Sequence, residues 1–75
     1  MIDKLEFFIA LARVQHFGKA AEELGITQPT LSAAIKQLED QLGVALFERS
    51  GRRVLITSAG EQIVERARIL IRDYE

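Results

Sequence analysis

The sequence predicts a mainly α-helical fold in which four helices accompany one two-stranded β-hairpin. Apolar residues recur at helical spacing in four segments, near 3–14, 19–24, 28–42 and 58–75. Gly25 and Gly43 directly follow the second and third segments, where a left-handed residue can close a helix. After the third segment, two short runs at 46–49 and 54–56 flank a polar turn and indicate a hairpin.

The first helix is predicted to begin at an N-cap, Asp3, with Glu6 completing a capping box, and to run to about Val14. It carries two apolar faces. One contains Leu5, Phe8, Ile9 and Ala12, and the nearly opposite one contains Phe7, Leu11 and Val14. Two interpretations follow: a small core wraps this helix on both sides, or one face contacts the C-terminal helix or another chain.

The second and third helices form a closely joined pair. We expect Gly18 to cap a helix that begins at Lys19, whose alanines allow a neighbouring helix to approach closely. Thr27 is a good N-cap for the third helix, with Pro29 in the first turn, where a missing N–H costs nothing. The apolar stripe of this third helix is Leu31, Ile35, Leu38 and Leu42.

The opposite face of the third helix is small and polar. Gln28 lies at its tip, and the face continues through Pro29, Ser32, Ala33, Lys36 and Asp40. A slim helix end fits a DNA major groove, which is about 12 Å wide, and its free N–H groups suit phosphate. Two helices joined by a short glycine turn are typical of a helix-turn-helix. Any small helical bundle with a glycine turn would show the same spacing.

The net charge of −1 argues weakly against a nucleic-acid ligand. Residues 48–56 nevertheless concentrate positive charge, because the segment contains Arg49, Arg52 and Arg53 but only one acidic residue, Glu48. Arginines at and beside the tip of a hairpin suit phosphates or an adjacent minor groove, so the hairpin is predicted to be a wing. The alternative is a solvated surface turn without a ligand.

The last helix has two successive N-cap candidates, Thr57 and Ser58, and Ser58 would form a capping box with Glu61. Its apolar stripe is wider than a thin core behind one helix needs, which predicts a contact surface for another chain. That stripe contains Ile63, Val64, Ala67, Leu70, Ile71 and Tyr74. No stop signal ends the helix, so we expect the chain to be a fragment of a longer protein.

Composition excludes several classes of function. The chain has no cysteine and one histidine, His16, which we expect to be a solvated loop residue rather than a metal ligand. The absence of cysteine fits a cytoplasmic protein, and the longest apolar run is too short to span a membrane. We expect no enzyme, because no paired-carboxylate cleft, phosphate loop or nucleophile–base pair is visible.

Six stretches together resemble the N-terminal domain of LysR-type transcriptional regulators. In order and at the family's spacing they are FGKAAEEL (17–24), TQPTLS (27–32), LE (38–39), LGV (42–44), LFER (46–49) and TSAG (57–60). The resemblance implies a winged helix-turn-helix domain at 1–57, with a three-helix core and a two-stranded wing, followed at 58–75 by the start of a long linker helix. It also implies homodimers formed by antiparallel linker helices on a pseudo-palindromic, double-stranded DNA site.

The resemblance assigns site residues position by position. Those expected near DNA bases are Gln28, Pro29, Thr30, Ser32 and Ala33, and those expected on the DNA backbone or in the wing are Thr27, Lys36, Arg49, Arg52 and Arg53. The chain departs from the family at Ala33 and Ala34, where arginine and glutamine are common, and at Leu55, where a charged residue is frequent. We therefore expect fewer direct base contacts, and more reliance on Gln28, on contacts to thymine methyl groups and on DNA shape.

The same resemblance implies no cofactor within these residues, since a small-molecule inducer would bind a separate effector domain. Two other interpretations stay open. The chain also looks similar to the N-terminal domain of molybdate-responsive regulators. Alternatively, it is a winged-helix protein-interaction module whose contact face is formed by Phe7, Leu11 and Val14.

Overall fold

The computed structural model describes residues 2–50 and 53–74. The elements follow one another as α1 (Ile2–Val14), α2 (Phe17–Leu24), α3 (Gln28–Leu42), β1 (Phe47–Ser50), β2 (Arg53–Ile56) and α4 (Ser58–Tyr74). The predicted mainly helical fold with one hairpin is therefore confirmed, in the predicted order.

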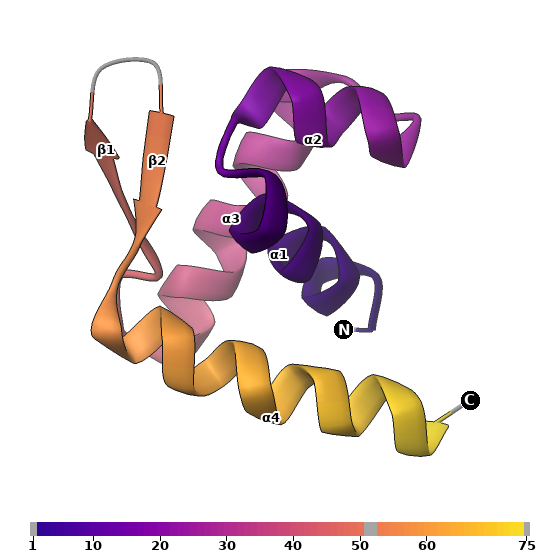
Figure 1. Ribbon diagram of the computed structural model, residues 1–75, viewed down its shortest axis with the longest axis vertical. Coiled ribbons are helices and arrows are strands. Elements are labelled where there is room, and N and C mark those ends of the chain that lie inside the picture. The colour runs from indigo at the N-terminus through magenta and orange to yellow at the C-terminus, as the bar shows by residue number, and fades with distance from the viewer. Residues whose placement is uncertain (1, 51–52, 75) are drawn as a thin grey trace.

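Helix α1 is the centre of the packing. Helices α2, α3 and α4 all contact it, and α2 also packs on α3 (Figure 1). The antiparallel hairpin of β1 and β2 stands beside this helical core, and α4 crosses the molecule at the end where β2 finishes (Figure 1). Helix α2 lies at one end of the molecule and α4 across the other, and α3 runs between them (Figure 1).

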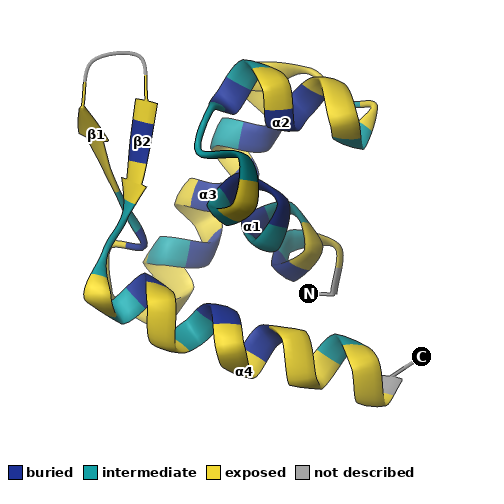
Figure 2. Ribbon diagram, viewed as in Figure 1, coloured by how far each residue is buried: buried dark blue, intermediate teal, exposed yellow. Residues whose placement is uncertain are grey.

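Buried side chains from all four described helices, from Leu46 and from β2 form the core, and Figure 2 marks the buried positions along the ribbon. The largest fully buried ones are Phe8, Leu11, Leu31, Leu38, Leu46 and Val54. The ring of Phe8 meets that of Phe47 edge-on, with centroids 5.5 Å apart, which is a favoured aromatic geometry. These contacts join the wing to α1, so the hairpin is part of the core rather than an appendage.

Both apolar faces of α1 lie against this core. Leu11 is completely buried, while Phe7 and Val14 are half-buried and pack against the buried cluster. The core therefore wraps α1 on both sides, and the predicted contact of α1 with the C-terminal helix is also confirmed, because α4 packs against it. The alternative docking face of an interaction module is wrong, since its central residue is covered within the chain.

The glycine turns behave as predicted. Gly25 ends α2 with φ 70°, and Gly43 ends α3 with φ 72°. The Gly43 N–H donates to the Glu39 carbonyl, and Ile26 N–H donates to the Ala21 carbonyl across the α2–α3 turn. Both glycines occupy the left-handed region that side chains with a Cβ rarely adopt, so they close their helices where the sequence indicates.

Two predicted helix starts are wrong by one or two residues. Helix α1 already includes Ile2, so Asp3 lies in its first turn and does not cap it. Helix α2 begins at Phe17, and Gly18 is inside it. Its N-cap is His16, whose Nδ1 accepts a hydrogen bond from the Lys19 N–H at 3.1 Å. The single histidine is therefore a half-buried capping residue.

The start of α4 selects one of its two predicted caps. The Oγ1 of Thr57 accepts a hydrogen bond from the Gly60 N–H at 3.0 Å and donates one to the Ala45 carbonyl at 2.7 Å. The Thr57 N–H also donates to the Leu46 carbonyl. Ser58 is the first helical residue, so the predicted capping box of Ser58 with Glu61 is wrong. Thr57 caps α4 and ties it to the segment that leads into β1.

Within the described residues, no helix combines the length and apolar character needed to cross a membrane. The same part of the chain contains no group of three histidine, aspartate or glutamate side chains placed to hold a metal ion.

Candidate nucleic-acid interface

The first turn of α3 is capped and open to solvent. Thr27 caps it as predicted, with its Oγ1 accepting from the Thr30 N–H at 3.2 Å and donating to the Thr30 hydroxyl at 2.8 Å. Gln28 and Pro29 follow in the first turn and are exposed. The N-terminal end of the helix therefore presents its partial positive charge and short side chains to solvent.

The two faces of α3 differ as the predicted stripe requires, with two exceptions. Leu31, Ile35 and Leu38 are buried. On the other face Ser32 is half-buried, and the remaining candidate contact residues are exposed: Thr27, Gln28, Pro29, Thr30, Ala33 and Lys36. Pro29, Ser32, Ala33 and Lys36 share the exposed side of α3, and Thr27, Gln28 and Thr30 lie at its N-terminal end.

Leu42 and Ala34 are the exceptions. Leu42, predicted to be in the stripe, has 44% of its surface exposed, because it ends α3 beside an apolar groove that is open to solvent. Ala34 is only 9% exposed and faces the core, so an alanine there removes nothing from the exposed face. Of the two departures from the family pattern on this helix, only Ala33 shortens the surface that α3 presents.

The starts of α2 and α3 lie side by side. A Cβ built on Gly18 would lie 3.7 Å from the Gln28 Oε1 and 3.2 Å from the His16 Cε1. The capping residue of α2 and the first residue of α3 are therefore neighbours, although twelve positions separate them in the sequence. Two helix N-termini face the same region of solvent.

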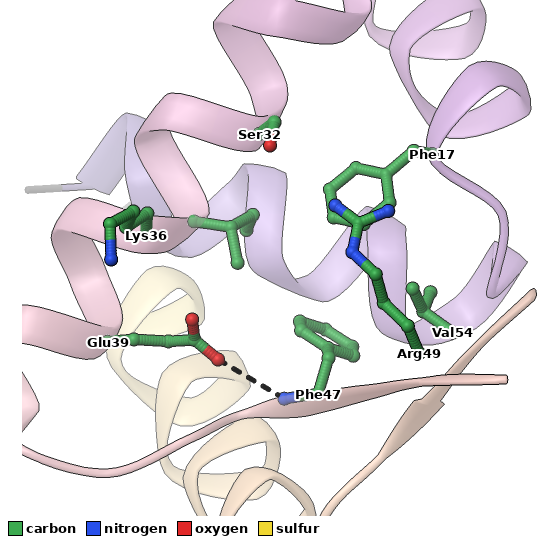
Figure 3. Close-up of a pocket in the computed structure, with 8 residues that line it drawn as sticks. Phe17, Ser32, Lys36, Glu39, Phe47, Arg49 and Val54 are labelled. Atoms are coloured by element: carbon green, nitrogen blue, oxygen red, sulfur yellow. Dashed lines mark hydrogen bonds between the residues drawn. The ribbon is translucent and has the colours of Figure 1, made fainter.

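A crevice of about 170 Å³ separates α3 from the wing (Figure 3). Ser32 and Lys36 line it from α3, and Arg49 lines it from β1. The Arg49 guanidinium carbon lies 4.7 Å from the centroid of the Phe17 ring, and Figure 3 shows the arginine extending toward that ring. This cation–π contact fixes the direction of a long side chain while its N–H groups remain exposed to solvent.

Glu39 connects α3 to the wing, which sequence reasoning missed. Its Oε2 accepts hydrogen bonds from the Leu46 N–H at 2.7 Å and from the Phe47 N–H at 3.3 Å, and Figure 3 shows the second of these. Hydrogen bonds to a charged group contribute about 1.5–3 kcal/mol each. From the sequence, only the position of Glu39 on its helix can be predicted. The sequence does not show that the amides of residues 46 and 47 lie within reach of this carboxylate.

The register of the hairpin determines on which face each of its described arginines lies. Arg49 pairs with Val54, and Ser50 pairs with Arg53. Because directly opposed residues share a face, Arg49 lies on the inner face with the buried Val54. Arg53 is exposed, and its Nη2 donates to the Gln15 Oε1 at 3.3 Å. Arg52, the third predicted wing arginine, lies outside the described residues.

The predicted contact stripe on α4 is divided by the structure. Val64 and Ala67 are 8% and 3% exposed and face the chain's own core, although Ala67 also lines the floor of the groove beside Leu70. Ile71 is half-buried and packs against the core, as does part of Ile63. Leu70, 49% exposed, remains open together with Ile63 along the groove that Leu42 also lines. The side chain of Tyr74 lies outside the described residues.

The helix pair with its exposed α3 start, and a hairpin that carries arginines beside it, define a winged helix-turn-helix domain. The profile of the family described as bacterial regulatory helix-turn-helix protein, lysR family, matches residues 2–61. The chain belongs to this LysR family, which also decides against a molybdate-responsive regulator.

Individual relatives agree with this membership. The chain is similar to the DNA-binding transcriptional dual regulator OxyR of Escherichia coli K12, with 49% identity over 72 residues that cover 96% of this chain and 24% of that protein. It is also similar to the DNA-binding domain of CbnR solved with DNA, with a TM-score of 0.93, 36% identity, and 96% and 83% of the two chains covered. For the DNA-binding domain of BenM on the catB site 1 DNA, the TM-score is 0.92 with 38% identity, and the coverage is 99% and 80%.

Proposed function

We propose that this chain binds double-stranded DNA sequence-specifically, as the DNA-binding domain of a LysR-type transcriptional regulator. One observation carries the proposal: the capped, exposed start of α3 and the wing arginines Arg49 and Arg53 all border residues 15–18, where α1 joins α2. A helix end aimed into the major groove, braced by guanidinium groups on the backbone, accounts for both features.

The base-reading part of the interface is the first two turns of α3. Gln28 is the one long amide there, and a glutamine can bond adenine through two hydrogen bonds in the major groove. The exposed Pro29 and Ala33 fit the methyl groups of thymine, while Thr30 and the half-buried Ser32 offer hydroxyl groups to bases or nearby backbone. Since Ala33 is short, much of the specificity is assigned to sequence-dependent DNA shape.

The remaining predicted residues contact the phosphate backbone. Thr27 and Lys36 border the exposed face of α3, and Arg49 and Arg53 extend from the wing. The ion pair of Lys36 with Asp40 spans 4.0 Å between exposed side chains, so it contributes little and leaves the ammonium free to bind phosphate. Arg52 stays in the proposal from its sequence position alone.

Replacing Arg49 and Arg53 together with alanine is expected to weaken duplex binding roughly five- to thirtyfold, for preferred and random sequences alike. Each lost phosphate contact removes counterion release, so the slope of log K against log salt should fall by about 1.8 for two contacts. Fluorescence anisotropy at several salt concentrations measures both quantities. The control is the Arg68→Ala, Arg72→Ala variant, which removes the same charge from exposed positions on α4. Equal salt slopes in the two variants would contradict DNA binding through the wing.

We also propose that the DNA-bound form is a homodimer on a pseudo-palindromic site. Support comes from the apolar groove along α4, lined by Leu5, Leu42, Ile63 and Leu70, which leaves large apolar side chains open to solvent. A second copy of α4 laid antiparallel would cover it and place two α3 helices in successive major grooves, roughly 34 Å apart.

Leu70→Glu is expected to convert such dimers to monomers, because it would bury an unpaired carboxylate in the apolar contact. Sedimentation velocity across a concentration series measures the change. Gln62→Glu adds the same charge at an exposed position of α4 outside the groove and should leave the dimer intact. A Leu70→Glu protein that still sediments as a dimer would place the subunit contact elsewhere.

The chain spans 24% of the length of the OxyR protein of Escherichia coli K12 that it resembles. We therefore assign any small-molecule inducer to a separate effector domain of the whole protein, with no cofactor needed for DNA binding itself. Binding to genomic DNA implies a cytoplasmic location for the whole protein.

A further inference from the structure

The connection between α1 and α2, residues 15–16, has an unusual backbone. Gln15 has φ 60°, the only positive φ of a non-glycine residue within the described part of the chain. Side chains with a Cβ rarely adopt this region, and such residues persist only where the surroundings hold them. The Gln15 N–H donates to the Leu11 carbonyl at 2.7 Å, so the turn closes α1 directly.

This α1–α2 corner (residues 15–17) contacts both strands of the wing. The Gln15 carbonyl accepts a hydrogen bond from the Val54 N–H at 3.3 Å, which attaches the outer edge of β2 to the corner. The Gln15 side-chain oxygen accepts from the Arg53 Nη2 at 3.3 Å. Two residues later, the buried Phe17 ring lies beneath the Arg49 guanidinium. Both described wing arginines therefore rest on one short segment.

We propose that Gln15 is a positioning residue for DNA binding, which holds Arg53 in the direction that a backbone phosphate requires. The inference rests on the proposed function. An arginine has five N–H donors, and one bond to Gln15 leaves four for phosphate oxygens. A long, exposed side chain that is already oriented loses less conformational freedom on binding. The left-handed turn aims the Gln15 amide at β2, and the buried Phe17 anchors the corner.

Gln15→Gly tests this inference, because glycine accepts φ 60° and keeps the carbonyl bond to Val54, yet removes the amide oxygen. We expect a loss of roughly three- to tenfold in duplex affinity, similar for preferred and random sequences. In an Arg53→Ala background the same change should cause no further loss, since the two residues act as a unit. Gln15→Asn provides a second variant that tolerates the left-handed turn but is one methylene too short.

The four proteins of this cycle separate the possible outcomes. Equal losses with and without Arg53 would overturn the positioning role, because Gln15 would then act independently of the arginine. Unchanged affinity in both Gln15 variants would also overturn it, and the proposed function would stand if Arg53→Ala still weakened binding. If Arg53→Ala itself changed neither affinity nor salt slope, the wing's part in the proposed function would fail instead. Thermal melting of each variant confirms that only folded proteins are compared.

Discussion

Gly60→Ala is expected to destabilise the domain by about 2–3 kcal/mol, the cost of forcing extra volume into a packed site. A Cβ at this position would lie 2.5 Å from the Leu46 carbonyl oxygen and 2.7 Å from the Ile56 Cγ1. The nearest atom belongs to the backbone, so a side-chain rotation cannot relieve the contact. The Leu46 carbonyl also accepts the Thr57 N–H, and displacing it disturbs the cap of α4.

The predicted destabilisation by Gly60→Ala is opposite in sign to the effect expected from helix propensity alone. Gly60 lies in the first turn of α4, and replacing an unconstrained helical glycine with alanine normally stabilises a protein by about 0.5–1 kcal/mol. A destabilisation therefore reports the close approach of α4 to the residues before β1, rather than a loss of helix propensity.

Urea unfolding followed by circular dichroism measures the change, and the melting temperature should fall by roughly 10–20 °C. Gln62→Ala, at an exposed position two residues along the same helix, is the control and should stay within about 0.5 kcal/mol of the parent. A Gly60→Ala domain as stable as the parent would show that α4 does not approach the Leu46 carbonyl so closely in solution.

Gln28→Ala is expected to lower affinity for a preferred site by about 1–3 kcal/mol, and to change affinity for random duplexes little. Gln28 is exposed at the first position of α3, beside the start of α2, and no other exposed candidate on this helix end carries a long amide. In the proposed interface, removing Gln28 would delete the hydrogen bonds that specify a base and would leave the phosphate contacts proposed for Arg49 and Arg53 unchanged.

A preferred site can be obtained by selection from a pool of random duplexes, which also reveals any two-fold symmetry. Binding of the parent and variant to this site and to random DNA then gives the specificity ratio. Gln37→Ala is a matched control, since Gln37 is an exposed glutamine on the same helix, nine positions or half a turn away in angle. Equal weakening on both duplexes would refute a base-reading role for Gln28.

Much of this fold follows from signals within a few residues. Gly25 and Gly43 end their helices because only a residue without a Cβ adopts the left-handed turn readily, and Thr27 caps α3 through a bond to an amide three residues on. These features are local, so the sequence alone predicts them. The exposed face of α3 follows similarly, since helical phase separates Leu31 and Ile35 from Pro29 and Ala33, while Gln28 is exposed because it begins the helix.

The errors arise where distant parts of the chain decide the outcome. Helical phase groups Val64 and Ala67 with Leu70, but the position of α1 determines which of them the chain buries itself. Leu42 continues the stripe of α3 in sequence, yet nothing in the described part of the protomer covers the end of that helix fully. The sequence predicts a solvated loop position for His16, whereas the structure shows that it caps α2. This cap depends on the ring nitrogen accepting from the Lys19 N–H, a contact that no residue pattern reveals.

The Glu39 carboxylate of α3 accepts hydrogen bonds from the Leu46 and Phe47 amides, where the hairpin begins. These bonds hold the distance between α3 and the wing arginines nearly constant. In the proposed complex, a duplex whose grooves do not match this distance would have to deform. The energy of that deformation depends on the stiffness of its base steps. Discrimination among genomic sequences would then extend to base pairs that no side chain touches.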